Sequence, residues 1–391
     1  MTSNLIKRLI AIFAALCLTF CFSACEGDPG DSSDSSSDTS GSEEDTMPKH
    51  KVGYIFHDEV DDFTFSFDMN KQRILAANRS SADTCYIDGV SITDFEDAVI
   101  KLAEAGCTDI VSGSSIFANM IGTVSGKYMN LNFIAYGTTG GGPNVSSYTE
   151  MPYQGAYAGG IAAAYNSFSR KIGIVADSDL LYAIPVINAA ALGTQAVFST
   201  AKTYVVGAMR DSEIEDAIDE LVERGCDVII CYTSSAHAED YCQNKGIKFV
   251  GSHDFSDMES DYSNMLMYFY TRRDSYFLAQ FKQMQLGTWQ TDVYTGNMGN
   301  GIVCISEALS ANKDDDCQRV LDALLPMLSN GGEIFSGQLV DNKGIVRYLQ
   351  TDTMSDQSIF SMDWYVQGVE VVGNYRQPQL TIPENPLEIQ F

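Results

Sequence analysis

Apolar positions along the chain fall into short continuous runs, separated by segments in which they recur with helical spacing. Two such segments, Asp94–Ala105 and Ser212–Arg224, begin with an N-capping residue and end before a glycine, and another helix is expected from about Ser66. The runs that predict strands are Val52–Phe56, Cys85–Ile87, Asp109–Ser112, Phe133–Tyr136, Ile172–Ala176, Tyr204–Val206, Val228–Tyr232, Ile247–Gly251 and Met265–Tyr268. This alternation of strands and helices is typical of an α/β fold with parallel sheets.

The opening of this pattern occurs twice. Lys51–Phe56, KVGYIF, is repeated as Lys171–Ala176, KIGIVA. Glu96–Val111 is matched in the same way by Glu215–Ile230, including a glycine between helix and strand. Two similar units in one chain indicate two lobes of one design. Ligands of open parallel sheets bind beyond the carboxyl ends of the strands, so the cleft between the lobes is the expected site.

These patterns also divide the chain into predicted segments. Glu26–His50 is acidic and rich in serine, so it cannot bury enough apolar surface to fold and is interpreted as a linker. After about Tyr270 the pattern is less regular, and we expect crossings between the lobes there. We predict a signal peptide at 1–24, a linker at 25–50, a first lobe at 51–165 with a return segment near 275–315, a second lobe at 166–270 with a return segment near 316–375, and a C-terminal tail at 376–391.

The N-terminal segment is typical of export. Lys7 and Arg8 precede Leu9–Phe22, an apolar run shorter than the roughly 20 residues that span a membrane. Small residues then precede Cys25 in a pattern that resembles a bacterial lipobox, in which the cysteine is lipidated. An ordinary secretory signal cleaved nearby is the alternative. Two or more acyl chains on Cys25 would anchor the protein stably to a membrane.

Composition narrows the possible partners. The 391 residues, 45% of them hydrophobic, provide for a large core, and the net charge of −28 argues against a nucleic-acid partner. Seven cysteines follow Cys25, so at least one is unpaired in a monomer. Cys107 and Cys226 occupy equivalent positions of the repeat, which favours small buried residues over disulfide partners. No CxxC motif or Cys/His cluster is present, so we predict no zinc site and no cofactor.

Catalytic motifs receive little support. Gly122–Lys127, GTVSGK, is one residue short of a phosphate loop and is followed by Tyr128 instead of Ser or Thr. No GxSxG motif and no paired acid and base candidates are present, so we predict a protein that is not an enzyme. His57 and His253 both follow predicted strands, where each could contact a ligand or hold a loop.

The loop after the first strand carries the most informative chemistry. Its residues Asp61–Phe65 place aromatic rings beside carboxylates. Such a set suits a ligand with a flat ring, which stacks on an aromatic face, and hydroxyl groups, which donate to carboxylates. Alternatively, Phe63, Phe65 and Phe67 alternate as core residues. We expect one or two of them in the core and one in the cleft.

Several stretches together resemble a known family. They are KVGYIF with DFTFSF near the start, Asn144–Ala162 with its Tyr-x-Gly-x-Tyr-x-Gly-Gly pattern, Ile184–Gly193, Leu286–Trp289, Gly299–Val303 and Ser361–Gly368. Their order and spacing over about Lys51 to Gly373 are similar to the Bmp/Med family of basic-membrane-protein lipoproteins, which includes purine nucleoside receptors.

This resemblance implies a type I periplasmic-binding fold, with two Rossmann-like lobes of parallel sheets joined by a hinge. It also implies a monomeric substrate-binding lipoprotein of an ABC importer, anchored to the extracytoplasmic face of the membrane. By family analogy, this protein binds a nucleoside-like ligand, such as a purine nucleoside, and delivers it to a permease. The alternatives are a ligand-sensing surface lipoprotein and a binder of another heteroaromatic compound or a sugar.

The resemblance also implies ligand contacts at the ends of strands. Many relatives have an acidic residue near Asn119 and an Asp at the position of Ser234, which this chain lacks, so a modified nucleoside or another heteroaromatic ligand is also compatible with the pocket. The residues implied are Asp62, Phe63, Thr64, Ser114, Ser115, Asn119, Tyr182, Asn188, Thr233, Ser234, His253, Asp254, Arg272 and Gly299.

Overall fold

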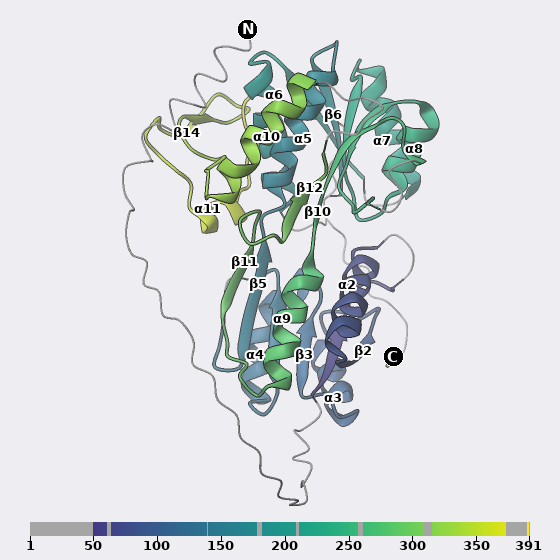
Figure 1. The fold of residues 1–391 in the computed structure, drawn as a ribbon, viewed down its shortest axis with the longest axis vertical. Helices are drawn as coiled ribbons and strands as arrows, with labels where there is room; N and C mark the ends of the chain where they lie inside the picture. The colour runs from purple at the N-terminus through teal and green to yellow at the C-terminus, as the bar shows by residue number, and fades with distance from the viewer. Residues whose placement is uncertain are drawn as a thin grey trace, which may run out of the picture. The chain divides into compact units, whose positions relative to one another are not determined.

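The continuous apolar runs form the central strands of two largely parallel sheets (Figure 1). The computed structural model describes residues 50–60, 64–138, 140–177, 182–208, 211–256, 261–307, 315–372 and 389–390, all within one compact unit, Met47–Phe391. The predicted signal peptide and Cys25, the linker before His50 and most of the predicted tail therefore lie outside the described residues.

The first sheet has six strands, all parallel, in the order β11-β5-β4-β3-β1-β2. Along β1, Ile55 faces one buried cluster while Val52, Tyr54 and Phe56 face another. Burial on both faces explains why this strand is apolar throughout instead of alternating. The strands are β1 (Lys51–Ile55), β2 (Asp83–Ile87), β3 (Asp109–Ser112), β4 (Asn132–Tyr136), β5 (Val145–Glu150) and β11 (Val293–Gly296).

The second sheet repeats this design. Its order is β12-β10-β9-β8-β6-β7-β15, and β6 lies between β7 and β8 as β1 lies between β2 and β3. The pairs are parallel except that β12 runs antiparallel to β10. The strands are β6 (Lys171–Ala176), β7 (Lys202–Gly207), β8 (Val228–Tyr232), β9 (Lys248–Gly251), β10 (Met265–Thr271), β12 (Val303–Ile305) and β15 (Val369–Val372). The α/β fold predicted from the alternating pattern is confirmed.

Helices cover both sheets. Gly106 and Gly225 follow α3 and α7 with φ of +87° and +88°, as the repeated pattern predicts, because a left-handed residue commonly ends a helix. The helices beside the first sheet are α2 (Phe65–Ser80), α3 (Phe95–Glu104), α4 (Ala118–Lys127) and α9 (Arg273–Gln285). Those beside the second are α5 (Tyr153–Asn166), α6 (Ala183–Val197), α7 (Asp211–Glu223), α8 (His237–Lys245) and α10 (Asp315–Ser329). None of the described helices is long and apolar enough to cross a bilayer.

Two glycines bring α5 and α6 into close contact. A Cβ on Gly160 would collide with the carbonyl of Ala190, and one on Gly193 would collide with the carbonyl of Tyr157. Both glycines belong to stretches that carry the family resemblance, and this close packing of the two backbones gives those motifs a physical reason. Because α5 packs on α6 and contacts β8, β9 and β10, it lies beside the second sheet, whereas the predicted first lobe of 51–165 includes this helix.

The chain passes between the two sheets in three described segments: from β5 to α5, from β10 to α9, and from β11 to β12. Backbone hydrogen bonds join them, from Met151 N to Gly296 O at 2.8 Å and from Arg272 N to Ile302 O at 2.7 Å. The segment near 275–315, predicted to return to the first lobe, contributes strands to both sheets, since β11 joins the first sheet and β12 joins the second. Hinge motion between the lobes would have to act through these crossovers.

Candidate functional site

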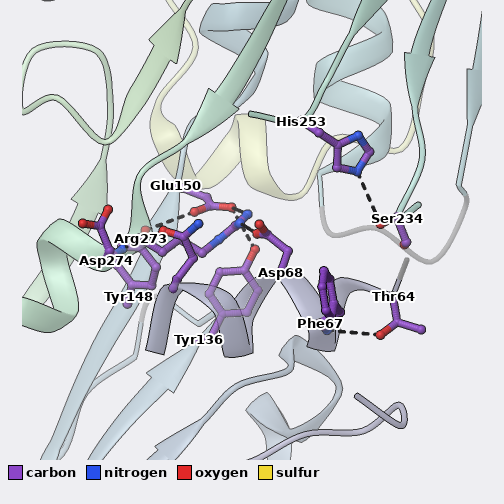
Figure 2. A network of polar contacts seen from close by, with 11 residues as sticks. Thr64, Phe67, Asp68, Tyr136, Tyr148, Glu150, Ser234, His253, Arg273 and Asp274 are labelled. Atoms are coloured by element: carbon purple, nitrogen blue, oxygen red, sulfur yellow. Dashed lines mark hydrogen bonds and ion pairs between the residues drawn. The ribbon is translucent and has the colours of Figure 1, made fainter. Parts of the chain in front are cut away.

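Several polar and aromatic side chains lie at or just beyond the carboxyl ends of the parallel strands. Tyr136 ends β4, Glu150 ends β5, Ser234 follows β8 and His253 follows β9. In Figure 2, His253 and Ser234 of the second lobe are seen together with Thr64, Phe67 and Asp68 of the first. This is the edge at which open α/β sheets bind ligands.

A buried ion-pair network occupies the crossovers. Arg273, at the start of α9, forms ion pairs with Asp68 of α2 and with Glu150 (Figure 2). Glu150 also accepts hydrogen bonds from the hydroxyls of Tyr136, at 3.1 Å, and Tyr148, at 3.0 Å. Burial alone would lower the pKa of Arg273, but the two carboxylates outweigh it and raise the pKa well above its usual value. The guanidinium is therefore a fixed positive charge at the hinge.

Aromatic rings pack against this charge. The Arg273 guanidinium lies over the ring of Phe65, 5.0 Å from its centroid, and Phe65 stacks on Tyr136 at 5.3 Å. Phe67 instead is 37% exposed on the first turn of α2. Phe63 lies outside the described residues, as does Asp62. Of the alternating phenylalanines, Phe65 is therefore packed against other rings, while Phe67 is exposed, and its place in a cleft stays a prediction.

Thr64 fixes the start of the helix that carries Phe67 and Asp68. It is the N-cap of α2, where its hydroxyl oxygen accepts from Phe67 N at 3.1 Å and its hydroxyl donates to Glu59 O at 3.0 Å. Such a cap satisfies one of the free N–H groups of a first helical turn. Thr64 thus has a structural role that does not depend on a ligand.

On the second lobe, a buried carboxylate holds His253. The Nδ1 of His253 lies 3.0 Å from Oε1 of the fully buried Glu239, which also accepts from Ser252 N at 3.1 Å. Since that carboxylate accepts, Nδ1 carries the hydrogen. Burial alone would lower the pKa of His253, but Glu239 outweighs it, Asp68 adds to the effect, and the pKa is raised. Among the described residues, the contact of the other ring nitrogen, Nε2, is a long one of 3.4 Å to Ser234 O.

Many relatives have an Asp at the position of Ser234. In this chain, the segment after a different strand supplies an acidic residue beside Ser234. The Ser234 hydroxyl donates to Oδ2 of Asp177 at 2.5 Å, and Asp177 directly follows β6. Its neighbour Thr233 is buried and donates its hydroxyl to Ser235 O at 2.7 Å. Ser234 therefore faces the site with its hydrogen committed to a carboxylate, while Thr233 is engaged within its own loop.

The prediction that Asn188 contacts a ligand does not fit its placement. Its amide is fully buried in α6, donates to Trp364 O at 2.8 Å and accepts from Val366 N at 2.9 Å. The motif that suggested this residue instead attaches the C-terminal segment to α6. Tyr182, directly before α6, is also buried, and its ring packs on Phe360 at 4.8 Å.

The remaining predicted residues lie at turns. Ser114 and Ser115 begin a short 3-10 helix after β3, where Ser112 Oγ contacts Ser114 O at 3.4 Å. The exposed residues are Asn119 in α4, Asp254 next to His253, Arg272 before α9, and Gly299 in the turn after β11. A Cβ on Gly299 would lie 2.6 Å from Ser329 O, so a glycine is required there by packing.

The most prominent site groups were missed by the sequence reasoning. They are Asp68, Tyr136, Glu150, Asp177, Glu239 and Arg273. A usable signal existed for Asp177, which directly follows the repeated strand motif KIGIVA just as His57 follows KVGYIF. No comparable signal pairs Glu150 with Arg273, which are 123 positions apart.

Comparison with known proteins agrees with this architecture. The Bmp family model, described as ABC transporter substrate-binding protein PnrA-like, matches residues 49–335. A purine-binding protein of Brucella abortus (strain 2308) is 25% identical over 333 residues, which are 82% of this chain and 93% of that protein.

Solved structures show the same fold. The ABC transporter solute-binding protein from Aeropyrum pernix K1 has a TM-score of 0.63 at 15% identity, over 72% of this chain and 92% of its own. The solute-binding protein from Conexibacter woesei DSM 14684 has a TM-score of 0.59 at 19% identity, over 72% and 97%. The type I periplasmic-binding fold is thereby confirmed, and the chain belongs to the Bmp family of PnrA-like ABC transporter substrate-binding proteins.

Proposed function

We propose that this protein binds a purine nucleoside or a close analogue between its lobes and delivers it to an ABC permease. One observation carries the choice of ligand class: the exposed aromatic ring of Phe67 and the carboxylate of Asp68, both on α2, are seen together with His253 and Ser234 in Figure 2. Asp68 acts electrostatically on His253, so the two sides are within range of each other. The similarity to a protein named as purine-binding supports the same class.

Each group would meet a different part of such a ligand. The ring of Phe67 offers a face on which a heterocycle stacks. With Nδ1 held by Glu239, the Nε2 of His253 accepts a hydrogen bond from the ligand when the ring is neutral and donates one when the ring is protonated. Asp68 keeps a partly exposed carboxylate that accepts from ligand hydroxyls. Polar groups on both lobes would make the ligand favour the closed state, which is the requirement for closure on binding.

We also propose that the protein is monomeric and anchored through a lipid on Cys25 to the extracytoplasmic face of the membrane. The lipobox-like sequence before Cys25 supports the anchor, and the acidic, serine-rich linker would hold the binding domain away from the bilayer. Metabolic labelling with a fatty-acid analogue checks this proposal: Cys25→Ala should remove the label, and a labelled variant would contradict it.

The ligand proposal is tested by titration calorimetry and thermal shift with purine nucleosides, pyrimidine nucleosides, free bases, riboflavin and simple sugars. A ligand at 100 times its Kd adds about 2.7 kcal/mol of stability, which is a readable shift. Phe67→Ala should abolish the shift. Phe168→Ala is the matched control, because Phe168 is 92% exposed and precedes β6, at the opposite end of the strand from the site.

The outcomes separate the alternatives. Binding of nucleosides that depends on Phe67 supports the proposal. Binding of bases or riboflavin without nucleosides would retain the aromatic site and reject recognition of the sugar. Binding of simple sugars alone, or an equal loss in Phe67→Ala and Phe168→Ala, would overturn it. Uptake of the bound compound by cells distinguishes import from sensing, since a sensor would bind the ligand without transport.

A further inference from the structure

Two buried thiols of the first lobe face each other. Cys85 lies in the edge strand β2, and Cys107 lies between α3 and β3. Their sulfur atoms are 3.5 Å apart, and both residues are almost completely buried. The two cysteines are 22 positions apart in sequence, so their contact depends on the fold and not on chain proximity.

The strand between them explains why they meet. Gly53 of β1 is the register partner of Cys85. A Cβ on Gly53 would lie 3.1 Å from Sγ of Cys107, so the thiol of Cys107 occupies space that a larger residue would fill. The backbone of Cys107 is held in turn, because its N–H donates to Leu102 O at 3.0 Å. The two thiols are therefore directed toward each other by fixed backbone on both sides.

The two sulfurs differ in chemical character. The hydrogen bond from Cys107 lowers the pKa of the Cys85 thiol; burial opposes this effect and nearby Lys51 assists it. The same hydrogen bond, together with burial, raises the pKa of Cys107. Cys85 is thus the more readily deprotonated sulfur, and the thiolate is the reactive form in disulfide exchange.

We propose that Cys85 and Cys107 form a disulfide when the protein matures outside the cytoplasm, where its family acts. The oxidant class is a disulfide, either of an oxidoreductase or of a small molecule such as oxidised glutathione. The Cys85 thiolate attacks it to give a mixed disulfide, and Cys107 then attacks the Cys85 sulfur and releases the remaining thiol. Both thiol protons and a pair of electrons pass to the oxidant, which leaves as two thiols.

The link would reinforce the lobe that carries the Phe67 helix. The disulfide would close a loop that contains α3 and would join β2 to the residues that directly follow α3. Edge strands open more readily than central ones, and β2 is paired on its outer side only by a bridge from Tyr86 to Gln390 among the described residues. Thiol–disulfide exchange at Cys85 and Cys107 is therefore expected during folding or during local opening of β2. This assignment replaces the expectation that Cys107 is a small buried residue without a partner.

Peptide mapping tests the proposal. The full chain is exported to an oxidising compartment, unfolded in denaturant with an excess of maleimide, digested without reduction and analysed by mass spectrometry. The expected product is a peptide pair joined through Cys85 and Cys107, lighter than the sum of its parts by a pair of hydrogen atoms. Cys304, which is only partly buried, should carry maleimide and serves as the internal control. Cys231 and Cys242 of the second lobe are also hydrogen-bonded to each other. Maleimide on both Cys85 and Cys107, or a disulfide found only between Cys231 and Cys242, would overturn the proposal.

Stability provides a second readout. Reduction should lower the unfolding temperature of the exported protein, and of Cys304→Ala, by about 5 °C, since the link constrains the unfolded chain. Reduction should leave the unfolding temperature of Cys107→Ala unchanged. An equal decrease in Cys107→Ala would assign the effect to another pair and reject this one. If Cys107→Ala fails to fold, mapping of the unmodified sequence still decides the question.

Discussion

The two sides of the candidate site are held in different ways. At the crossovers, Arg273 is paired with carboxylates that are 123 and 205 positions away in sequence; that of Glu150 is buried in the network, and that of Asp68 stays partly exposed. On the second lobe, His253 is held by Glu239, only 14 positions away. Among the described residues, its Nε2 contacts Ser234 O at a long distance of 3.4 Å. The first arrangement fixes the geometry of the hinge, whereas the second leaves a ring nitrogen for a ligand. Arg273 and Glu150 thus serve the structure, whereas His253 and the exposed part of Asp68 are left for recognition.

The largest effect is expected from breaking the crossover network. Arg273→Met leaves the buried carboxylate of Glu150 without its cation, and the loss of one partner of a buried pair costs about 3 to 5 kcal/mol. The free energy of unfolding, measured with urea, should fall by that amount. Arg272→Met is the matched control and should change it by less than about 0.5 kcal/mol, because Arg272 is exposed. Equal effects of the two variants would show that the buried ion pairs of Arg273 do not stabilise the crossovers.

Asn188 tests whether a family motif marks recognition or structure. Asn188→Ala leaves the carbonyl of Trp364 and the N–H of Val366 without their partners, which should cost about 1 to 3 kcal/mol in the free energy of unfolding. The affinity for ligand should change less than twofold in calorimetry. Asn119→Ala, at an exposed predicted site residue, is the control for stability. A large loss of affinity in Asn188→Ala without a loss of stability would return this residue to the site.

The His253–Glu239 pair should give stability a pH dependence. Folding raises the pKa of His253, so the protonated form contributes stability that is fully present below the unfolded value of about 6.5 and is lost as the pH rises through the higher folded value. Unfolding temperatures measured from about pH 5 to pH 9 should show this decline. It should be reduced in Glu239→Gln and kept in His237→Gln, a histidine that contacts Glu215 in α7 instead. An unchanged profile in Glu239→Gln would refute the assignment.

How far the sequence could predict this structure depends on the distance between interacting residues. The strands Val52–Phe56 and Val228–Tyr232 were recognisable because burial on both faces makes them apolar throughout. Strand β5 was missed because Ser146, Ser147 and Thr149 are buried although they are polar. Such residues are typical of loops, and only the neighbouring strands of the folded sheet make them strand residues.

The same reasoning applies to the site. Ser234 and His253 could be placed because each directly follows a recognisable strand. The pairing of Arg273 with Glu150 and Asp68 could not be predicted, because three separate segments must first fold to bring these charges together. For Asn188, the motif was recognised but its role was not, since the segment that it binds lies far along the chain and has no regular pattern.

The smallest effect is expected at Thr64, the N-cap of the helix α2 that carries Phe67 and Asp68. Thr64→Ala removes the N-cap and should lower the free energy of unfolding by about 1 kcal/mol, while Thr64→Ser keeps the hydroxyl and should remain close to the unmodified protein. Fraying of this first turn would displace Phe67, so the affinity for ligand should fall in Thr64→Ala and be retained in Thr64→Ser. If Thr64 touches the ligand through its methyl group, both variants would lose affinity although only Thr64→Ala loses stability. Calorimetry and urea denaturation on the same preparations therefore distinguish a residue that holds the recognition helix from one that contacts the ligand.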